Sequence, residues 1–568
     1  MTDQPTPALA PGVRRRWGNT PYPPGHADRY RKAGLWRDLT IPAALDEVVR
    51  GHADHAAVIT PSAHWTYAEL AERSEAVAAG LLEEGLRPGD PVVLQVTNSV
   101  HTAAAWYGML RAGLVPVCTL ASHRRYEIVE IARRTGAVAH LVQADLPSFD
   151  LVAFAGEVAG LLPGMRALLT VGAAAGAPGT RIEDLEERRP TRAQRAALRK
   201  VAEETDLGAP AVLQLSGGTT GSPKVIPRLH PEYWYNAVAT ARHWDLTSAD
   251  RLAFGLPLVH NAGIVNALHA AHSVGAALLL STPAAGDLLP LMAAENASWF
   301  MSPPGVMGDY LAHPGFGKAF TGLRHCVLTA ARVPHRTFDA LDARGIRVGQ
   351  AFGMTEGLFL FTPAGASREM RATTVGVPIS PLDEVRLLRP HTGDTAEPGE
   401  AGELCVRGPY TIRGYLDAPE RNAEAFTSDG FYRSGDIVQP HEIDGMTAYS
   451  VVGRVKDLIN RGGEKINAEE VETLLLRHPA VADVALVAMP DERLGERGCA
   501  YAVVRRGHPT PSLTDLCATL EHQGLAKYKW PERLEYVDVL PRTAIGKIYK
   551  SALREDIAQR LARADGGG

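Results

Sequence analysis

The sequence predicts an α/β fold, with a large N-terminal domain of several α/β subdomains and a small α+β C-terminal domain. Three observations lead to this prediction. The chain has 568 residues, more than a single hydrophobic core usually serves. Its first part alternates between helical periodicity and short apolar runs, which is typical of parallel sheets with helical crossovers. After Asp436 the pattern becomes that of a compact α+β segment.

The individual elements follow from periodicity and turn residues. Short apolar runs predict strands, amphipathic stretches predict helices, and a run rich in Ala and Gly predicts a loop. In chain order these are a helix at 67–83, strands at 91–95 and 114–118, a loop at 173–179, an exposed helix at 188–204, a strand at 213–215 and a helix at 551–563. The stretches 481–489 and 499–504 belong to the compact α+β pattern of the C-terminal part. We place the domain boundary near Lys456, which gives domains 1–455 and 456–568.

Composition excludes several classes of function. The formal net charge is −5, with 45% hydrophobic and 22% charged residues, so the sequence carries no electrostatic signature of nucleic-acid or anionic membrane binding. The five cysteines are scattered singly, which favours reduced thiols and a cytoplasmic location. The N-terminus has no signal-peptide pattern, and the apolar stretch at 275–280 is too short for a membrane span. We expect small molecules or proteins as partners.

A glycine-rich segment at 216–224, SGGTTGSPK, follows the predicted strand at 213–215. Glycines bring backbone N–H groups close to phosphate oxygens, hydroxyls add donors, and a lysine adds positive charge. The spacing differs from a Walker A loop because Pro223 precedes Lys224 and an apolar pair follows it. The segment therefore predicts a different kind of ATP phosphate loop, and a flexible surface loop is the alternative. The residues predicted to bind phosphate are Ser216, Gly217, Gly218, Thr219, Thr220, Gly221 and Lys224.

Further motifs follow in a fixed order. They are FGMTEG (352–357), GEL (402–404), YRSGD (432–436), GRVKD (453–457) and PRTAIGK (541–547). Together with the phosphate loop they resemble the signature of the adenylate-forming superfamily, which includes acyl-CoA synthetases, luciferases and the adenylation domains of peptide synthetases. The resemblance covers nearly the whole chain. It implies ATP and Mg²⁺ as cofactors, and activation of a carboxylic acid as its acyl-adenylate.

The resemblance also assigns roles to individual residues. Lys547 would bridge the carboxylate and the α-phosphate during adenylation, and Glu356 would bind Mg²⁺ through an oxygen ligand, as a hard cation requires. Thr355 would bond the α-phosphate. Without the surrounding motifs, Lys547 would be interpreted as a solvated lysine and the Thr355–Glu356 pair as a helix N-terminus.

The same resemblance places the nucleoside and the hinge. Asp436 would accept both ribose hydroxyls and Arg454 would assist there, whereas an exposed turn is the alternative for Asp436. Gly353 and Ala330 would contact the nucleotide. Lys456 lies where the family hinges its C-terminal domain between the two half-reactions, after which the segment 462–465 would approach the active site.

The opening segments, TPYP (20–23), RYR (29–31) and GLW (34–36), resemble the start of stand-alone enzymes that adenylate 2,3-dihydroxybenzoate or salicylate. The segment PLVHN (257–261) resembles the substrate strand of those enzymes. In that subfamily the counterpart of Asn261 binds the carboxylate and the ortho-hydroxyl of the ring, which favours an ortho-substituted aromatic acid. His260 would pack beside the carboxylate, and a histidine satisfied within the core is the alternative.

The rest of the expected pocket departs from the subfamily pattern. Ala262 replaces an aromatic residue, Asn266 replaces serine or cysteine, and the Thr329-Ala330-Ala331 segment replaces Gly-Gly-Ala. Phe359 and Leu360 replace smaller or polar residues. These differences predict an ortho-hydroxy or ortho-amino aromatic acid with another polar or methyl substituent, such as hydroxyanthranilate, hydroxypicolinate or a methylsalicylate. Alternatively, Asn266 caps a helix.

The sequence thus predicts an aryl-acid adenylating enzyme that passes its aryl group to the thiol of a carrier protein in trans. This transfer would serve the biosynthesis of a siderophore or an antibiotic. A ligase that uses free CoA is the closest alternative. An inactive homologue that acts as a binding protein is the alternative from another class, although the predicted metal acid, ribose acid and lysine are all present.

Overall fold

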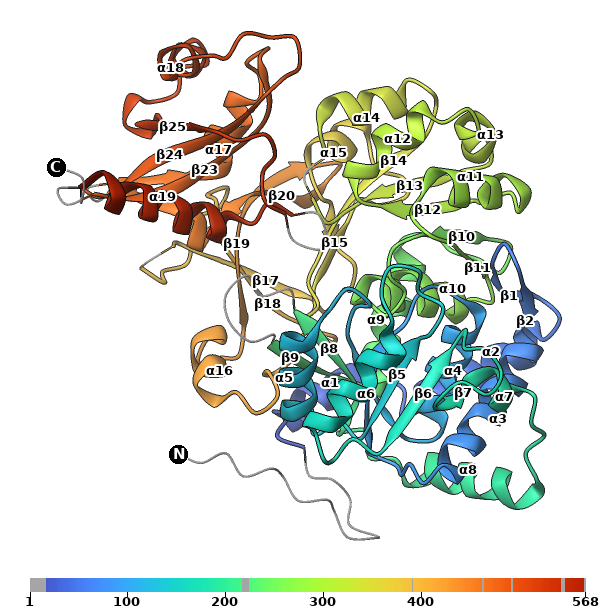
Figure 1. Cartoon of the computed structure of the whole chain (residues 1–568). Helices are drawn as coiled ribbons and strands as arrows, with labels where there is room; N and C mark the ends of the chain where they lie inside the picture. The colour runs from blue at the N-terminus through green and yellow to red at the C-terminus, as the bar shows by residue number, and fades with distance from the viewer. Residues whose placement is uncertain are drawn as a thin grey trace. The chain divides into compact units, whose positions relative to one another are not determined.

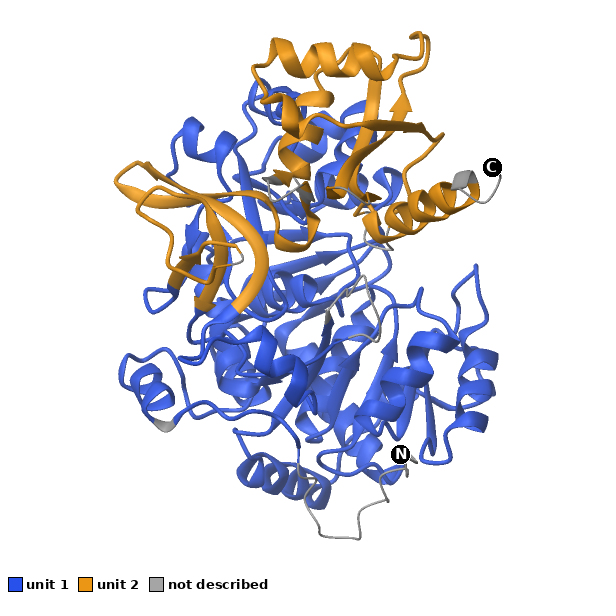
Figure 2. Cartoon of the chain, turned by 90° about the vertical axis from the view of Figure 1, so that its left-hand side faces the viewer, with its two compact units in different colours: residues 1–218, 222–384, 407–432 blue, residues 219–221, 385–406, 433–568 orange. Residues whose placement is uncertain are grey.

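The computed structural model describes residues 17–216, 224–331, 333–390, 392–461, 464–491, 494–542 and 547–565. The chain divides into two compact units (Figure 2). The N-terminal unit comprises residues 1–218, 222–384 and 407–432, and the C-terminal unit comprises 219–221, 385–406 and 433–568. The predicted α/β class is confirmed. The predicted boundary between a core domain at 1–455 and a mobile domain at 456–568 stays a prediction.

Two large sheets form the frame of the N-terminal unit (Figure 1). The nine-stranded sheet has the order β16 (Val377–Pro378), β15 (Phe359–Phe361), β14 (Val348–Gly353), β13 (His325–Leu328), β12 (Trp299–Ser302), β10 (Arg251–Phe254), β11 (Ala277–Leu280), β1 (Ala56–Ile59) and β2 (His64–Thr66). The seven-stranded sheet has the order β7 (Thr180–Arg181), β6 (Ala167–Val171), β5 (Ala139–Gln143), β3 (Pro91–Gln95), β4 (Val115–Cys118), β8 (Pro210–Ser216) and β9 (Lys224–Leu229).

The C-terminal unit carries two smaller sheets. A four-stranded sheet has the order β17 (Glu384–Leu388), β18 (Gly402–Arg407), β19 (Tyr432–Ile443) and β20 (Met446–Arg454). Three of its strand-end residues, Glu384, Arg407 and Tyr432, belong to the N-terminal unit. A five-stranded sheet contains β22 (Glu464–Asn467), β21 (Leu458–Arg461), β24 (Gly495–Val504) and β23 (Val481–Asp491) in this order, and β25 (Arg533–Tyr536) pairs with β24.

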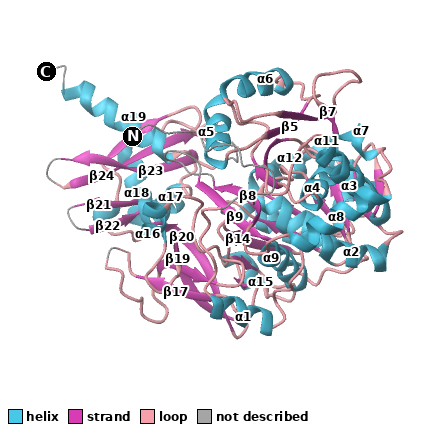
Figure 3. Cartoon of the chain, turned by 90° about the horizontal axis from the view of Figure 1, so that it is seen from below, coloured by secondary structure: helices cyan, strands magenta, loops and turns pink. Residues whose placement is uncertain are grey.

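Helices connect the strands in both units (Figure 3). Those of the N-terminal unit are α1 (Pro24–Lys32), α2 (Ile41–His52), α3 (Tyr67–Glu83), α4 (Val100–Arg111), α5 (Arg125–Thr135), α6 (Leu151–Leu161), α7 (Ile182–Glu186), α8 (Arg192–Glu204), α9 (His230–His243), α10 (Ala270–Ser273), α11 (Ala285–Ala294), α12 (Met307–Ala312), α13 (Phe316–Phe320), α14 (His335–Asp342), α15 (Arg368–Thr373) and α16 (Pro419–Ala425). Those of the C-terminal unit are α17 (Ala468–Leu475), α18 (Leu513–His522) and α19 (Lys550–Asp565).

Local signals explain where the elements begin. The helix predicted at 67–83 is confirmed as α3, and Thr66 starts it with a capping box in which Glu69 bonds back to the Thr66 backbone. The helix predicted at 188–204 begins later, at Arg192, because Thr191 is its N-cap and forms a capping box with Gln194. The strand predicted at 91–95 is confirmed as β3, buried along its whole length.

Parallel pairing sets the position of the candidate site. Strands β10, β12, β13 and β14 run parallel, so their carboxyl ends lie along one edge of the sheet. The buried side chains of this sheet and its helices form two large apolar clusters. In open α/β sheets this edge is the usual place for ligands.

Candidate functional site

The turns that follow β13 and β14 carry several of the predicted residues. Ala330, just after β13, has a φ of 69°, a left-handed conformation that glycine adopts at lower cost. Gly357 has a φ of 102°, and a Cβ on it would meet the Tyr410 carbonyl oxygen at 2.2 Å. Strain at a non-glycine residue such as Ala330 is often held at functional sites. The structure therefore places two unusual backbone positions at the predicted nucleotide-binding edge.

The predicted metal acid lies in the turn between β14 and β15. Thr355 and Glu356 are not at a helix N-terminus, because their turn connects two antiparallel strands. The Glu356 side chain is buried, and its Oε1 accepts a hydrogen bond of 2.8 Å from the Tyr415 hydroxyl. A carboxylate held by one oxygen keeps acceptor capacity on the other, which suits a hard cation.

A buried ion pair stabilises this turn. Arg228 and Glu232 are both fully buried and form two hydrogen bonds, of 2.9 and 2.7 Å. The Arg228 guanidinium also donates to the carbonyl oxygens of Thr355, at 2.8 Å, and Tyr410, at 3.1 Å. The Arg228 guanidinium thereby connects Glu232 of α9 to two backbone segments, one at Thr355 and one at Tyr410, which lies close to Gly357 in space.

We expect an Arg228→Met substitution to lower the free energy of unfolding by about 3 kcal/mol, because it leaves the Glu232 carboxylate buried without its partner. Urea unfolding followed by circular dichroism measures this change. The double variant Arg228→Met with Glu232→Leu is the control, since it removes both charges. It should recover part of the loss, and a double variant as unstable as the single one would contradict the explanation.

Asn261 lies at the end of a directed chain of hydrogen bonds. Gln214 donates from Nε2 to the Tyr233 hydroxyl at 3.0 Å, and that hydroxyl donates to Asn261 Oδ1, also at 3.0 Å. All three side chains are buried. Because the amide oxygen of Asn261 accepts from Tyr233, its NH₂ group is the part of the amide that can donate to a ligand.

The segment 257–261 is not the strand that the resemblance suggested, because it forms a turn that leads into helical residues. Pro257 cannot donate to a strand ladder, and Asn98 Oδ1 accepts from the Leu258 N–H at 2.8 Å, which holds the turn. The half-buried His260 lies in this turn, and its Nδ1 accepts from the Ala262 N–H at 3.3 Å. The turn thus presents Asn261 at the start of a helix.

Asn266 lies within the π-helix η1 (Gly263–His269) rather than at a helix cap. It is buried, and its Oδ1 accepts a hydrogen bond of 3.3 Å from Thr240 of α9. Phe359 and Leu360 are both buried, but they are neighbours in β15 and so point to opposite faces of the strand. Phe359 stacks on Phe361, with ring centroids 5.2 Å apart. A pocket on one face of this strand therefore takes only one of the two side chains.

The C-terminal unit holds Asp436, Arg454, Lys456 and Lys547. Asp436 and Arg454 are partners in the β19–β20 ladder, and the Arg454 Nε lies 2.8 Å from Asp436 Oδ1. Lys547 is exposed, yet neighbouring protein atoms partly desolvate its ammonium group and lower its pKa. The charges of Arg454 and Lys456 lower this pKa further, and Asp436 opposes them. The pKa of Lys456 is also lowered, chiefly by burial.

Part of the predicted phosphate loop lies outside the described residues, namely Gly217, Gly218, Thr219, Thr220 and Gly221. The backbone of Ser216 ends β8, but its side chain is outside the description. The same holds for Gly462, Gly463 and the side chains of Glu464 and Lys465 in the second predicted segment. Lys224 is described, and it begins β9.

Three residues outside the sequence motifs connect the predicted ones. Arg228, Tyr233 and Tyr415 each contact a predicted site residue, and none belongs to a motif used above. Arg228 lies in β9 and Glu232 in the first turn of α9, so their ion pair joins two elements and no helical spacing marks it. No local pattern marks Tyr415.

The aromatic residues of the opening segment have a structural role. Tyr22 donates to the Thr411 carbonyl oxygen at 2.5 Å, and the Trp36 indole donates to the Pro409 carbonyl oxygen at 2.7 Å. The two rings pack edge to face with centroids 4.8 Å apart. This opening segment therefore anchors residues 409–411, the same stretch that Gly357 and Arg228 contact.

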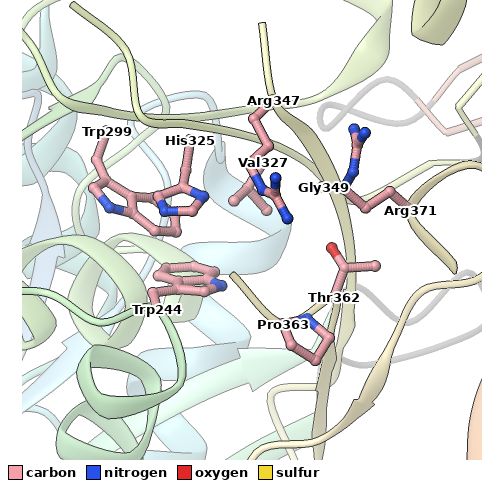
Figure 4. Close-up of a pocket in the computed structure, with 9 residues that line it drawn as sticks. All are labelled: Trp244, Trp299, His325, Val327, Arg347, Gly349, Thr362, Pro363 and Arg371. Atoms are coloured by element: carbon pink, nitrogen blue, oxygen red, sulfur yellow. The ribbon is translucent and has the colours of Figure 1, made fainter. Parts of the chain in front are cut away.

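A small pocket of the N-terminal unit lies elsewhere (Figure 4). It is lined by Trp244, Trp299, His325 and Arg347 among others, and it includes none of the predicted site residues. Trp299 and His325 begin β12 and β13, whereas the predicted residues follow the carboxyl ends of the neighbouring strands. The pocket is thus at the opposite edge of the nine-stranded sheet.

The fold is that of an adenylate-forming ligase. Residues 45–416 match the model of the AMP-binding enzyme family, and residues 470–547 match that of the AMP-binding enzyme C-terminal domain. The chain belongs to the AMP-binding enzyme family and is an ATP-dependent carboxylate-AMP ligase of the aryl-acid type.

Individual relatives agree with this assignment. A Streptomyces salicylyl-CoA synthase / salicylate adenylyltransferase is 40% identical, over 95% of this chain and 98% of its own. The 2,3-dihydroxybenzoate-AMP ligase of Bacillus subtilis is 37% identical, over 96% and 98%. The apo structure of MbtA from Mycobacterium smegmatis is 36% identical with a TM-score of 0.71, over 95% and 98%.

Among the described residues, no helix has the length and apolar character that crossing a membrane requires.

Proposed function

We propose that the enzyme activates an ortho-substituted aromatic acid as its aryl-AMP and transfers the aryl group to the phosphopantetheine thiol of a carrier protein. The observation that carries the substrate class is the chain from Gln214 through Tyr233 to Asn261. It orients the Asn261 NH₂ as a donor, which matches a carboxylate or an ortho-hydroxyl oxygen. The names of two relatives, which refer to salicylate and 2,3-dihydroxybenzoate, agree with an ortho-hydroxy acid.

Mg²⁺ is part of this proposal. Among the described residues, no group of three or more His, Cys, Asp or Glu side chains could hold a metal ion. Glu356 alone would supply a protein oxygen, and ATP phosphates and water would complete the coordination, as is usual for Mg²⁺ in nucleotide sites. The buried carboxylate with one oxygen already held by Tyr415 fits that task. Bound Mg²⁺ would neutralise charge that develops on the phosphoryl oxygens.

The chain's own residues would perform the other steps. Asn261 orients the acid, Thr355 and Lys224 hold phosphate oxygens, and Lys547 places a positive charge between the carboxylate and the α-phosphate. Asp436 and Arg454 would hold the ribose. Rotation at Lys456 would then replace Lys547 by another face of the C-terminal domain for thiol attack.

ATP–pyrophosphate exchange tests the substrate class. A panel of benzoic, picolinic, aliphatic and amino acids should give exchange with an ortho-hydroxy or ortho-amino aromatic acid. Exchange with aliphatic acids alone, or with none of the panel, would contradict the proposal. The preferred acid can then be offered with ATP and either free CoA or a phosphopantetheinylated aryl carrier protein. Faster transfer to CoA would favour the CoA ligase, a role that the salicylyl-CoA synthase name of one relative also suggests.

We expect Asn261→Ala to lower kcat/KM for the preferred ortho-substituted acid by about 30-fold, because the ortho group and the carboxylate lose their donor. Unsubstituted benzoate is the internal control, since it lacks the ortho group, and its kcat/KM should fall several-fold less. The KM for ATP should not change. An equal loss for both acids would show that Asn261 does not read the ortho position.

A further inference from the structure

The Tyr415 hydroxyl takes part in three hydrogen bonds. It donates to Glu356 Oε1 at 2.8 Å, it accepts from the Lys224 ammonium at 3.1 Å, and it lies 3.0 Å from the Tyr432 hydroxyl. A phenol can donate one hydrogen bond, and Tyr415 donates it to the Glu356 carboxylate. Tyr432 must therefore be the donor in the third bond. The Tyr415 oxygen therefore accepts hydrogen bonds from Lys224 and Tyr432 while its own proton is donated to Glu356.

Burial makes this arrangement strong. Tyr415 is 0% exposed and Glu356 is 6% exposed. In such surroundings, bonds in a chain polarise one another and are screened little by water. The bond from the Tyr415 hydroxyl to the Glu356 carboxylate is therefore strengthened by its surroundings.

The Tyr415 side chain joins segments that are far apart in the sequence. Lys224 is the last residue of the predicted phosphate loop, and Glu356 is the predicted metal acid. The Lys224 ammonium also lies 4.8 Å from the centre of the Tyr415 ring, as a cation–π contact. The phenol thus touches both of the groups that would contact the phosphates and their metal.

The position of Tyr415 does not depend on its hydroxyl. Its N–H donates to Asn422 Oδ1 at 2.7 Å, and its carbonyl oxygen accepts from Asn422 Nδ2 at 3.0 Å. The next residue, Leu416, donates to the Val225 carbonyl oxygen at 3.0 Å, which aligns this segment with the start of β9. Removal of the hydroxyl alone should therefore leave the ring in place.

We propose that Tyr415 is a positioning residue that couples the phosphate-loop lysine to the metal acid. It holds one oxygen of Glu356, leaves the other for the metal that the site would bind, and holds the Lys224 ammonium at its own hydroxyl. This inference rests on the proposed role of Glu356 as the Mg²⁺ ligand. It extends that role, because metal and phosphate binding become linked through one phenol.

Metal binding tests the first half of the coupling. Mn²⁺ can replace Mg²⁺ and be followed by electron paramagnetic resonance, in the presence of a non-hydrolysable ATP analogue and without any acid. Tyr415→Phe should raise the half-saturating Mn²⁺ concentration about tenfold, because a hydrogen bond to a charged group is lost. At saturating metal, the kcat of exchange should fall much less than that. Unchanged Mn²⁺ affinity in a folded variant would overturn the proposal.

Two further tyrosines serve as matched controls. Tyr67→Phe removes a buried hydroxyl whose only partner among the described residues is the Ala276 carbonyl oxygen, so Mn²⁺ affinity should not change. Tyr432→Phe removes a donor to Tyr415 without touching Glu356, and its effect should be smaller, about threefold. An equal shift in all three variants would indicate general loosening of the unit and overturn the coupling.

A double-mutant cycle tests the second half. Lys224→Met and Tyr415→Phe should each weaken binding of the ATP analogue, and the double variant should lose clearly less than the product of the two effects. Strictly multiplicative losses would show that the phenol does not connect the lysine to the acid.

Glu356→Gln separates this inference from the proposed function. If Glu356→Gln leaves Mn²⁺ affinity intact, the assignment of the metal ligand fails, and the coupling fails with it. If Glu356→Gln weakens Mn²⁺ binding and Tyr415→Phe does not, only the coupling is wrong. The choice of aromatic acid affects neither result, because no acid is present.

Discussion

Replacement of Lys547 by alanine is expected to lower the rate of ATP–pyrophosphate exchange by about 10³-fold, equivalent to roughly 4 kcal/mol of transition-state stabilisation. The proposed reaction brings an anionic carboxylate to an anionic phosphate, so a missing cation raises the barrier directly. Lys547 is exposed, and its removal leaves no cavity, so the thermal unfolding temperature should not change.

Lys527→Ala is the matched control for this variant. Lys527 also belongs to the C-terminal unit, and its ammonium lies 5.9 Å from the Trp530 ring centre. Its removal should leave exchange within about twofold of the wild type, as is usual for surface substitutions. Retained exchange in Lys547→Ala would remove this lysine from the adenylation step.

The pH dependence gives a second test of Lys547. Only the ammonium form can neutralise the reacting anions, and the pKa of this group is lowered by desolvation and by Arg454 and Lys456. Exchange should therefore decline on the alkaline side at a pH below 10.5, the ordinary lysine value. In Lys547→Ala, the residual rate should lack this alkaline decline.

Glu356→Gln is expected to lower exchange by two to three powers of ten, about 3–4 kcal/mol, because the neutral amide binds Mg²⁺ far more weakly. Part of the loss should be recovered at high Mg²⁺ concentration, which a purely structural defect would not allow. The amide can still accept the Tyr415 hydrogen bond, so the fold should be preserved.

Glu232→Gln provides a contrast for Glu356→Gln. Glu232 is an equally buried acid of the same unit, but its partner is Arg228 rather than a predicted ligand group. This variant should lower stability and leave the half-saturating Mg²⁺ concentration of the folded enzyme unchanged. A shift in Mg²⁺ dependence for Glu232→Gln, and none for Glu356→Gln, would contradict the assignment.

The fold class and most elements were predictable because their signals are local. The helix α3 and the strand β3 have the predicted bounds, since a capping box and a short apolar run mark them within a few residues. The segment 257–261 was wrongly expected to be a strand. Its apolar residues resemble one, but the side chain of Asn98, far away in the sequence, holds the turn.

The candidate site was predictable as a set of residue types and not as a set of contacts. Glu356, Asp436 and Lys547 follow from motifs, because each motif carries its chemistry in a few adjacent residues. Their roles remain predictions that the experiments above test. Phe359 and Leu360 show what the motifs could not predict. Both were expected in one pocket, but as neighbours in β15 they point to opposite faces of the strand.

By itself, the sequence determined the family, the order of the motifs and the chemistry that the reacting groups can perform. The tertiary structure decided how those groups are held. The bonds from Arg228 to the Thr355 carbonyl oxygen and from Tyr415 to Glu356 join residues 127 and 59 positions apart. Such pairings depend on how sheets and helices pack, and no local pattern encodes them, because hydrogen bonds form between neighbours in space.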